Sequence, residues 1–107
     1  MKTLMMLALV DTLYTIKIVN FGGEAPTGLD DLKIKILEKD LNCINKFRSL
    51  VESLINYVLN LQQQHKQYLI DNGQHWENDP YWKKLDGICD KYETVLDRFN
   101  WIVNDVN

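Results

Sequence analysis

The stretch DPYWKKLDGICDKYETVLDRFNWIVNDVN, residues 79–107, decides the fold of this chain. Its apolar residues recur at alternating steps of four and three, the spacing of one face of an α-helix. Asp79 followed by Pro80 is typical of an N-cap and a first helical position. We therefore predict a helix over about 80–106. Its apolar face consists of Tyr81, Leu85, Ile88, Tyr92, Val95, Phe99, Ile102 and Val106.

A second apolar ladder widens this face. It repeats at intervals of seven residues and consists of Trp82, Cys89, Leu96 and Val103. The combined face is broader than the seam of a two-stranded coiled coil, so one partner helix cannot cover it. The width predicts a helical bundle rather than an isolated hairpin.

Residues 29–72 contain no Pro or Gly and predict a longer helix. Their apolar residues follow steps of three and four, with two consecutive steps of three meeting at Ile44, where the helix could bend. Thr27 and Asp30 resemble a capping box at its start, and Asn72-Gly73 supplies the stop. We predict that this helix and 80–106 form an antiparallel hairpin.

Residues 3–20 form the ambiguous segment. Leu4–Val10 favours a helix, whereas the alternation of Tyr14, Ile16 and Ile18 with polar residues favours a strand. A hairpin turning at Asp11-Thr12 would lack the glycine that tight turns prefer. We expect a helix here, with a short β-hairpin as the alternative, and an all-α single domain over 1–107.

Composition excludes several classes of protein. The 15 acidic and 12 basic residues give a net charge of −3, without the basic excess of a phosphate binder. Asp11 and Lys17 interrupt the apolar N-terminal segment, and a membrane span needs roughly 20 mostly apolar residues. We expect a cytoplasmic protein without a membrane partner, with Cys43 and Cys89 as reduced core residues.

Helix lengths raise the question of self-association. At ~1.5 Å per residue a helix over 29–72 is about 65 Å long and one over 80–106 about 40 Å, so the second covers only part of the first. Either the long helix breaks near Asn42–Asn45 and the chain closes into a compact bundle, or two chains pair. We favour a homodimer.

The sequence predicts no catalytic, cofactor-binding or metal-binding residues. Gly22-Gly23 lacks the context of a phosphate-binding loop. His65, His75 and Cys89 could approach one another near the hairpin end, but their spacing matches no zinc motif. We therefore expect a protein that is not an enzyme and needs no cofactor.

The candidate partner-binding residues are aromatic and acidic. Trp101 falls off both apolar ladders and should point away from the hairpin core, Trp76 lies in the interhelical loop, and Tyr57 flanks the long helix. An acidic stripe at steps of four, three and four consists of Asp86, Asp90, Glu93 and Asp97. Such a stripe is either solvated or meets a basic partner surface.

A basic ladder of Lys84, Lys91 and Arg98 runs along another side of the same helix. We expect these side chains to cover the apolar edge or to pair with acidic residues of the long helix.

These features favour a small non-enzymatic protein–protein interaction module that forms a homodimer and binds another protein. An inhibitor of a host enzyme or defence system, encoded by a phage or mobile element, is one example. One alternative is a dimeric nucleic-acid-associated regulator that presents Lys33, Lys35, Lys39 and Lys46. The other is a structural subunit of a larger assembly.

Overall fold

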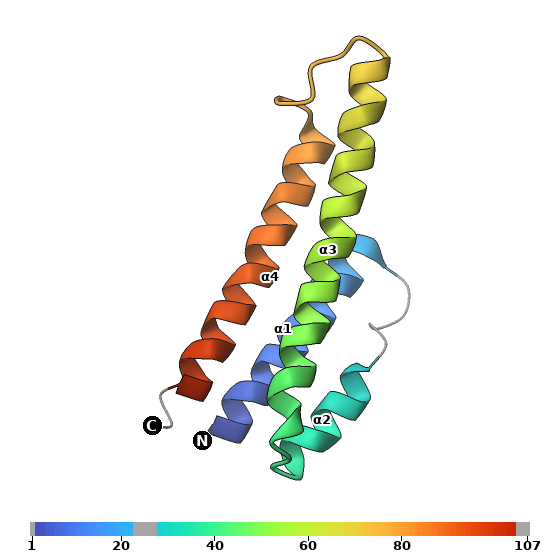
Figure 1. The fold of residues 1–107 in the computed structure, drawn as a ribbon. Coiled ribbons are helices and arrows are strands. Elements are labelled where there is room, and N and C mark those ends of the chain that lie inside the picture. The colour runs from blue at the N-terminus through green and yellow to red at the C-terminus, as the bar shows by residue number, and fades with distance from the viewer. Residues whose placement is uncertain (1, 23–27, 105–107) are drawn as a thin grey trace.

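A computed structural model describes residues 2–22 and 28–104, and it confirms the all-α prediction. The helices are α1 (Lys2–Phe21), α2 (Leu29–Leu37), α3 (Asn42–Asp71) and α4 (Pro80–Asn104). They run alternately up and down, so that α1 begins and α4 ends at the same end of the molecule (Figure 1). Residues 3–20 are helical, so the β-hairpin alternative for this segment is wrong.

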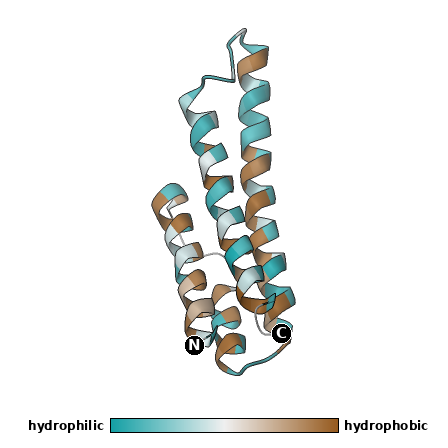
Figure 2. Ribbon diagram, turned by 90° about the vertical axis from the view of Figure 1, so that its left-hand side faces the viewer, coloured by the Kyte–Doolittle hydropathy of each residue, from teal (hydrophilic) through white to brown (hydrophobic). Residues whose placement is uncertain are grey.

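The four helices pack in a ring at one end of the molecule. Contacts join α3 to α4, α4 to α1, α1 to α2 and α2 to α3, which leaves α1 and α3 diagonally opposite. Beyond this four-helix end, α3 and α4 continue together as a two-helix hairpin, and the molecule measures 52 × 29 × 19 Å (Figure 1). Figure 2 shows apolar residues concentrated in the four-helix end and hydrophilic residues more frequent toward the free end of the hairpin.

The wide apolar face of α4 is covered from two sides, by α3 and by α1. Most of the predicted face is confirmed, because it is buried at Leu85, Ile88, Cys89, Tyr92, Val95, Phe99 and Ile102. Tyr81, predicted on the same face, is exposed because it lies at the start of α4 in the two-helix part, and Val106 lies outside the described residues. From α1, Leu9, Val10, Leu13 and Ile16 join the same core. Within one chain, α1 and α3 therefore bury most of the α4 face that was predicted to be too wide for one partner helix.

The predicted continuous helix over 29–72 is wrong, because residues 38–41 divide it into α2 and α3. Lys39 adopts a left-handed conformation with φ of 59°. The Asp40 amide donates to the Lys35 carbonyl at 3.0 Å, and the Lys39 amide donates to the Ile36 carbonyl at 3.1 Å. These two bonds form a Schellman motif, which ends a helix and reverses the chain. The break lies just before the Asn42–Asn45 segment in which the sequence allowed one.

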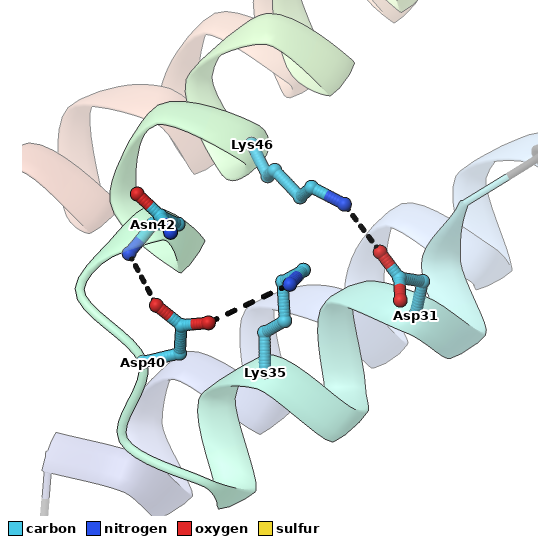
Figure 3. Close-up of polar contacts among 5 residues, drawn as sticks. All are labelled: Asp31, Lys35, Asp40, Asn42 and Lys46. Atoms are coloured by element: carbon cyan, nitrogen blue, oxygen red, sulfur yellow. Dashed lines mark hydrogen bonds and ion pairs between the residues drawn. The ribbon is translucent and has the colours of Figure 1, made fainter.

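Asp40 holds the new turn in place (Figure 3). Its Oδ1 accepts the Asn42 amide at 2.9 Å, its carbonyl accepts the Cys43 amide at 3.0 Å, and its Oδ2 lies 3.5 Å from Lys35 Nζ. The Asn42 amide, followed by Lys35, keeps the pKa of this carboxyl below its usual value. These contacts provide acceptors for backbone amides at the start of α3, which have no partner within the helix. They also hold the turn after which α3 runs antiparallel to α2.

The other predicted helix ends are confirmed where the structure describes them. Gly73 has φ of 70°, and the Gln74 amide donates to the Leu69 carbonyl at 2.8 Å, which terminates α3. Asp79 Oδ2 accepts the Trp82 amide at 3.0 Å and so caps α4. Thr27 of the predicted capping box lies outside the described residues.

By length and composition alone, α1 could span a membrane, although the sequence suggested that Asp11 and Lys17 exclude this. The indication is weak, because the core helix of a water-soluble protein passes the same test. In this fold one side of α1 packs into the bundle core, whereas Leu4, Met5, Tyr14 and Val19 are exposed.

Candidate protein-contact surface

The side of α4 that points away from the bundle carries Asp86, Asp90, Glu93, Asp97 and Trp101, which we call the α4 outer face. All five side chains are exposed. Within residues 2–22 and 28–104, none of the four carboxylates forms an ion pair. Asp86 Oδ1 accepts a hydrogen bond from Gln62 Nε2 at 3.2 Å. The structure therefore brings together most of the predicted partner-binding residues on one helix face.

Trp101 is 63% exposed, which confirms that it points away from the hairpin core. It lies beside α1 rather than beneath it, in a hollow of about 420 Å³ lined by Met5, Ala8, Leu9, Arg98, Trp101 and Ile102. Burying a tryptophan of this exposure against a partner would remove a large apolar area from water. The hollow is therefore a candidate contact site.

The groove between α1 and α4 continues past Arg98. A second hollow of about 330 Å³ is lined by Leu9, Thr12 and Ile16 of α1 and by Asp90, Lys91, Thr94, Val95 and Arg98 of α4. The two hollows share Leu9 and Arg98, so together they form one groove, the α1–α4 groove. Its α4 side carries one carboxylate, Asp90, and two cations, Lys91 and Arg98.

Of the two arrangements expected for the basic ladder, pairing with acidic residues of the long helix is not seen among the described residues. Lys84, Lys91 and Arg98 are exposed, and none of them forms an ion pair with the residues that the structure describes. Lys91 and Arg98 instead line the α1–α4 groove. Among the described residues no carboxylate pairs with them, so their charges are available to a partner.

Trp76 and Tyr57 lie away from the α4 outer face. Trp76 is half-buried in the loop after α3, where it packs 4.9 Å from the Trp82 ring and under Lys66 Nζ at 4.0 Å. Tyr57 is exposed on α3 and meets the Phe21 ring edge-on at 5.8 Å. The structure therefore separates the predicted partner-binding residues into three places.

A hydrogen-bonded pair at the hairpin end was not predicted from the sequence. His65 Nε2 lies 2.7 Å from Asp79 Oδ2, and both side chains are partly buried. The Trp82 amide first, and then His65, keep the pKa of Asp79 below its usual value. Because that carboxylate already caps α4, the pair links the end of α3 to the start of α4.

The cysteines are placed as core residues. Cys43 and Cys89 are free and buried, as expected. Burial raises the pKa of both thiols, and nearby carboxylates add to this effect. Fewer thiolates form at neutral pH, which disfavours both nucleophilic attack and metal binding. Within the described ranges, no group of three or more His, Cys, Asp or Glu side chains is arranged to hold a metal ion.

The four lysines of the nucleic-acid alternative are mostly engaged with carboxylates. Lys33 Nζ lies 3.3 Å from Asp11, Lys35 pairs with Asp40, and Lys46 pairs with Asp31 (Figure 3). Each ion pair weakens the positive potential that phosphate binding needs. The α1–α4 groove and the α4 outer face remain the strongest candidate site. No protein-family model, no curated protein and no solved structure matches this chain.

Proposed function

We propose that this chain is a small non-enzymatic protein-binding module that acts in the cytoplasm through the α4 outer face. The exposed indole of Trp101, next to four carboxylates without ion-pair partners among the described residues, carries this proposal. Tryptophan is enriched among the residues that contribute most to binding energy in protein interfaces. Because Trp101 stands on a rigid helix, its binding to a partner would cost little conformational entropy.

The chemistry of the face indicates the kind of partner. Asp86, Asp90, Glu93 and Asp97 project from the same side of α4 and give it a negative potential. A partner with a basic surface would associate faster because of this field, and salt would slow the association. An inhibitor encoded by a phage or mobile element, which occupies a basic surface of a host enzyme or defence protein, would act in this way.

The nucleic-acid alternative is less well supported. Of its four lysines, Lys33, Lys35 and Lys46 already have carboxylate partners in the chain. The carboxylates of the α4 outer face would also repel a phosphate backbone. Binding of a protein would use side chains of the α4 outer face that are already exposed. Binding of nucleic acid would require breaking the ion pairs of these lysines.

Site-specific photo-crosslinking in the native host tests the proposal. A photo-reactive amino acid replaces Glu93 or Asp86 on the α4 outer face, and the matched control replaces Glu52, which is exposed on α3. We expect an adduct with another protein from the α4 positions but not from Glu52. Adducts from neither α4 position, or the same adducts from all three, would refute the assigned surface. Fractionation of the same cells tests the cytoplasmic location, and recovery in the membrane fraction would contradict it.

A further inference from the structure

We propose that a hollow at the open end of the four-helix bundle binds a small amphiphile with an aliphatic chain and an anionic head, such as a fatty carboxylate. The hollow lies where α1 begins, α2 turns into α3 and α4 ends (Figure 1). Its volume is about 530 Å³, larger than either hollow of the α1–α4 groove. Small-molecule sites commonly have volumes of roughly 300–1,000 Å³. None of its lining residues belongs to the α4 outer face, so this site goes beyond the proposed function.

Most of the lining is apolar, and all four helices contribute to the hollow. Ile36 and Cys43 are its buried part, at 2% and 6% exposure, whereas Leu41 in the turn is 81% exposed. An aliphatic chain in the hollow would remove apolar area of these side chains from water. The complete apolar lining consists of Met6, Ile36, Leu41, Cys43, Ile44 and Val103.

The charged part of the lining has an excess of cations. Lys2 and Lys39 both line the hollow, and neither forms an ion pair with the residues that the structure describes. The one carboxylate of the lining, Asp40, already accepts the Asn42 amide and pairs with Lys35 (Figure 3). Because Lys35 balances the charge of Asp40, the two lining lysines give the hollow a positive potential. An anionic head group would be stabilised there.

The backbone holds both lysines beside the apolar lining. Lys39 occupies the left-handed position of the turn between α2 and α3, with φ of 59°. Lys2 stands in the first turn of α1, next to Thr3, which also lines the hollow. The Thr3 hydroxyl can donate a hydrogen bond to a head group that Lys2 attracts.

The two kinds of lining residue together select an amphiphile. A small polar anion would pair with Lys2 and Lys39 but would leave the apolar side chains in contact with water. An uncharged hydrocarbon would cover the apolar side chains but would leave both cations without a partner. A molecule with an aliphatic chain and an anionic head satisfies both.

The size of this end argues against a second copy as the occupant. The molecule measures 52 × 29 × 19 Å, and the hollow opens at one end of the long axis (Figure 1). The end face is therefore no larger than 29 × 19 Å. A stable protein interface buries about 800 Å² on each partner, which exceeds that cross-section. A small molecule needs no such area.

Titration of the full chain with octanoate, followed by NMR, tests the site. Octanoate is used below the concentration at which it forms micelles. We expect the shift changes to cluster at Met6, Ile36, Ile44 and Val103. Octan-1-ol, with the same chain but no charge, should bind more weakly, and octylammonium should bind most weakly of the three. Shift changes centred on Trp101 instead, or octylammonium binding as tightly as octanoate, would overturn the proposal.

Reversing one charge separates the head-group contact from the rest of the site. Lys39→Glu should raise the dissociation constant for octanoate about fivefold, because an attraction becomes a repulsion. It should leave the constant for octan-1-ol unchanged, which a general loss of structure would not. Lys84→Glu, exposed near the start of α4, is the matched control and should change neither constant. Equal weakening of both ligands by Lys39→Glu, or the same effect from Lys84→Glu, would refute the anionic head.

Filling the hollow tests the position of the aliphatic chain. Val103→Phe from α4 and Ile44→Phe from α3 should each weaken the binding of octanoate and of octan-1-ol, with thermal unfolding showing that the variant is folded. A folded variant that binds octanoate as tightly as the unmodified chain would overturn the proposal. Shift changes at the same residues on raising the protein concentration alone would overturn it too, because they would show a second copy in the hollow.

This proposal and the proposed function fail separately. If octanoate does not bind but a photo-reactive residue at Glu93 captures another protein, the amphiphile site is refuted and the proposed function stands. If octanoate binds as described but no other protein is captured, the amphiphile site stands and the assigned protein-contact surface is refuted.

Discussion

The rings of Phe47 and Phe99 lie stacked face to face, with centroids 3.9 Å apart and planes 5° from parallel. Phe47 comes from α3 and Phe99 from α4, and both side chains are fully buried. This pair joins the two long helices at the level where α1 and α2 complete the bundle.

Replacing either phenylalanine by leucine should lower the free energy of unfolding, because each change removes buried ring surface and leaves a gap. The two losses should not add. The stacked pair contributes about 0.5–1.5 kcal/mol beyond the burial of area, and the first substitution already removes that contribution. Urea unfolding of Phe47→Leu, Phe99→Leu and the double variant measures the coupling. Strictly additive losses would show that the rings pack independently.

Lys39→Gly should raise the free energy of unfolding by about 1 kcal/mol, because a left-handed conformation costs a residue with a side chain about that much. The matched control is Glu38→Gly at the preceding residue, which has a right-handed conformation. There the glycine should be destabilising. Thermal unfolding of both variants is the measurement. A lower melting temperature for Lys39→Gly would argue against a break at this residue.

Acid should destabilise the hairpin end through Asp79. The pKa of its carboxyl is lower in the folded chain than its ordinary value of 3.8, chiefly because of the Trp82 amide and then His65. Its contribution to stability is therefore complete above the unfolded pKa and is lost as the pH falls through the lower folded value. Asp79→Asn keeps an oxygen for the cap but removes the charge, so it should reduce this acid dependence.

Urea unfolding as a function of pH measures the effect at Asp79. Asp79→Ala should destabilise the chain more than Asp79→Asn near neutral pH, because it also removes the cap. Glu52→Gln, at an exposed residue of α3, is the control. If it changed the acid dependence as much as Asp79→Asn does, the effect would not belong to the cap.

Gly87→Ala should stabilise the chain by about 0.5–1 kcal/mol, since glycine is unfavourable inside a helix. Apart from the neighbouring residues and the backbone of α4 itself, no atom of the described residues lies within 4 Å of the added carbon. The measurement is best made in a Trp101→Ala background, so that a change in self-association does not contribute. A loss of stability in that background would reveal a contact that position 87 makes within its own chain.

Sequence reasoning located α4 and its buried face, because these depend on local spacing and on caps such as Asp79 and Gly73. It also placed Trp101 on the surface, since that residue breaks the apolar ladders. The pair of His65 and Asp79 was not predictable, because the two residues are 14 positions apart and meet only when the hairpin forms. The α1–α4 groove was likewise missed, because its lining comes from opposite ends of the sequence.

The sequence by itself determined an all-α chain, the stops around the hairpin loop and an apolar face on α4 too wide for one partner. Only the tertiary structure decided where residues 29–72 divide and which helix covers the rest of that face. Lys39 carries no local signal for a left-handed turn. The turn is retained because it folds α2 back and buries Leu29, Leu32 and Ile36 in the bundle core. Burying such side chains stabilises by about 1.5–3 kcal/mol each, which outweighs the cost of one strained residue.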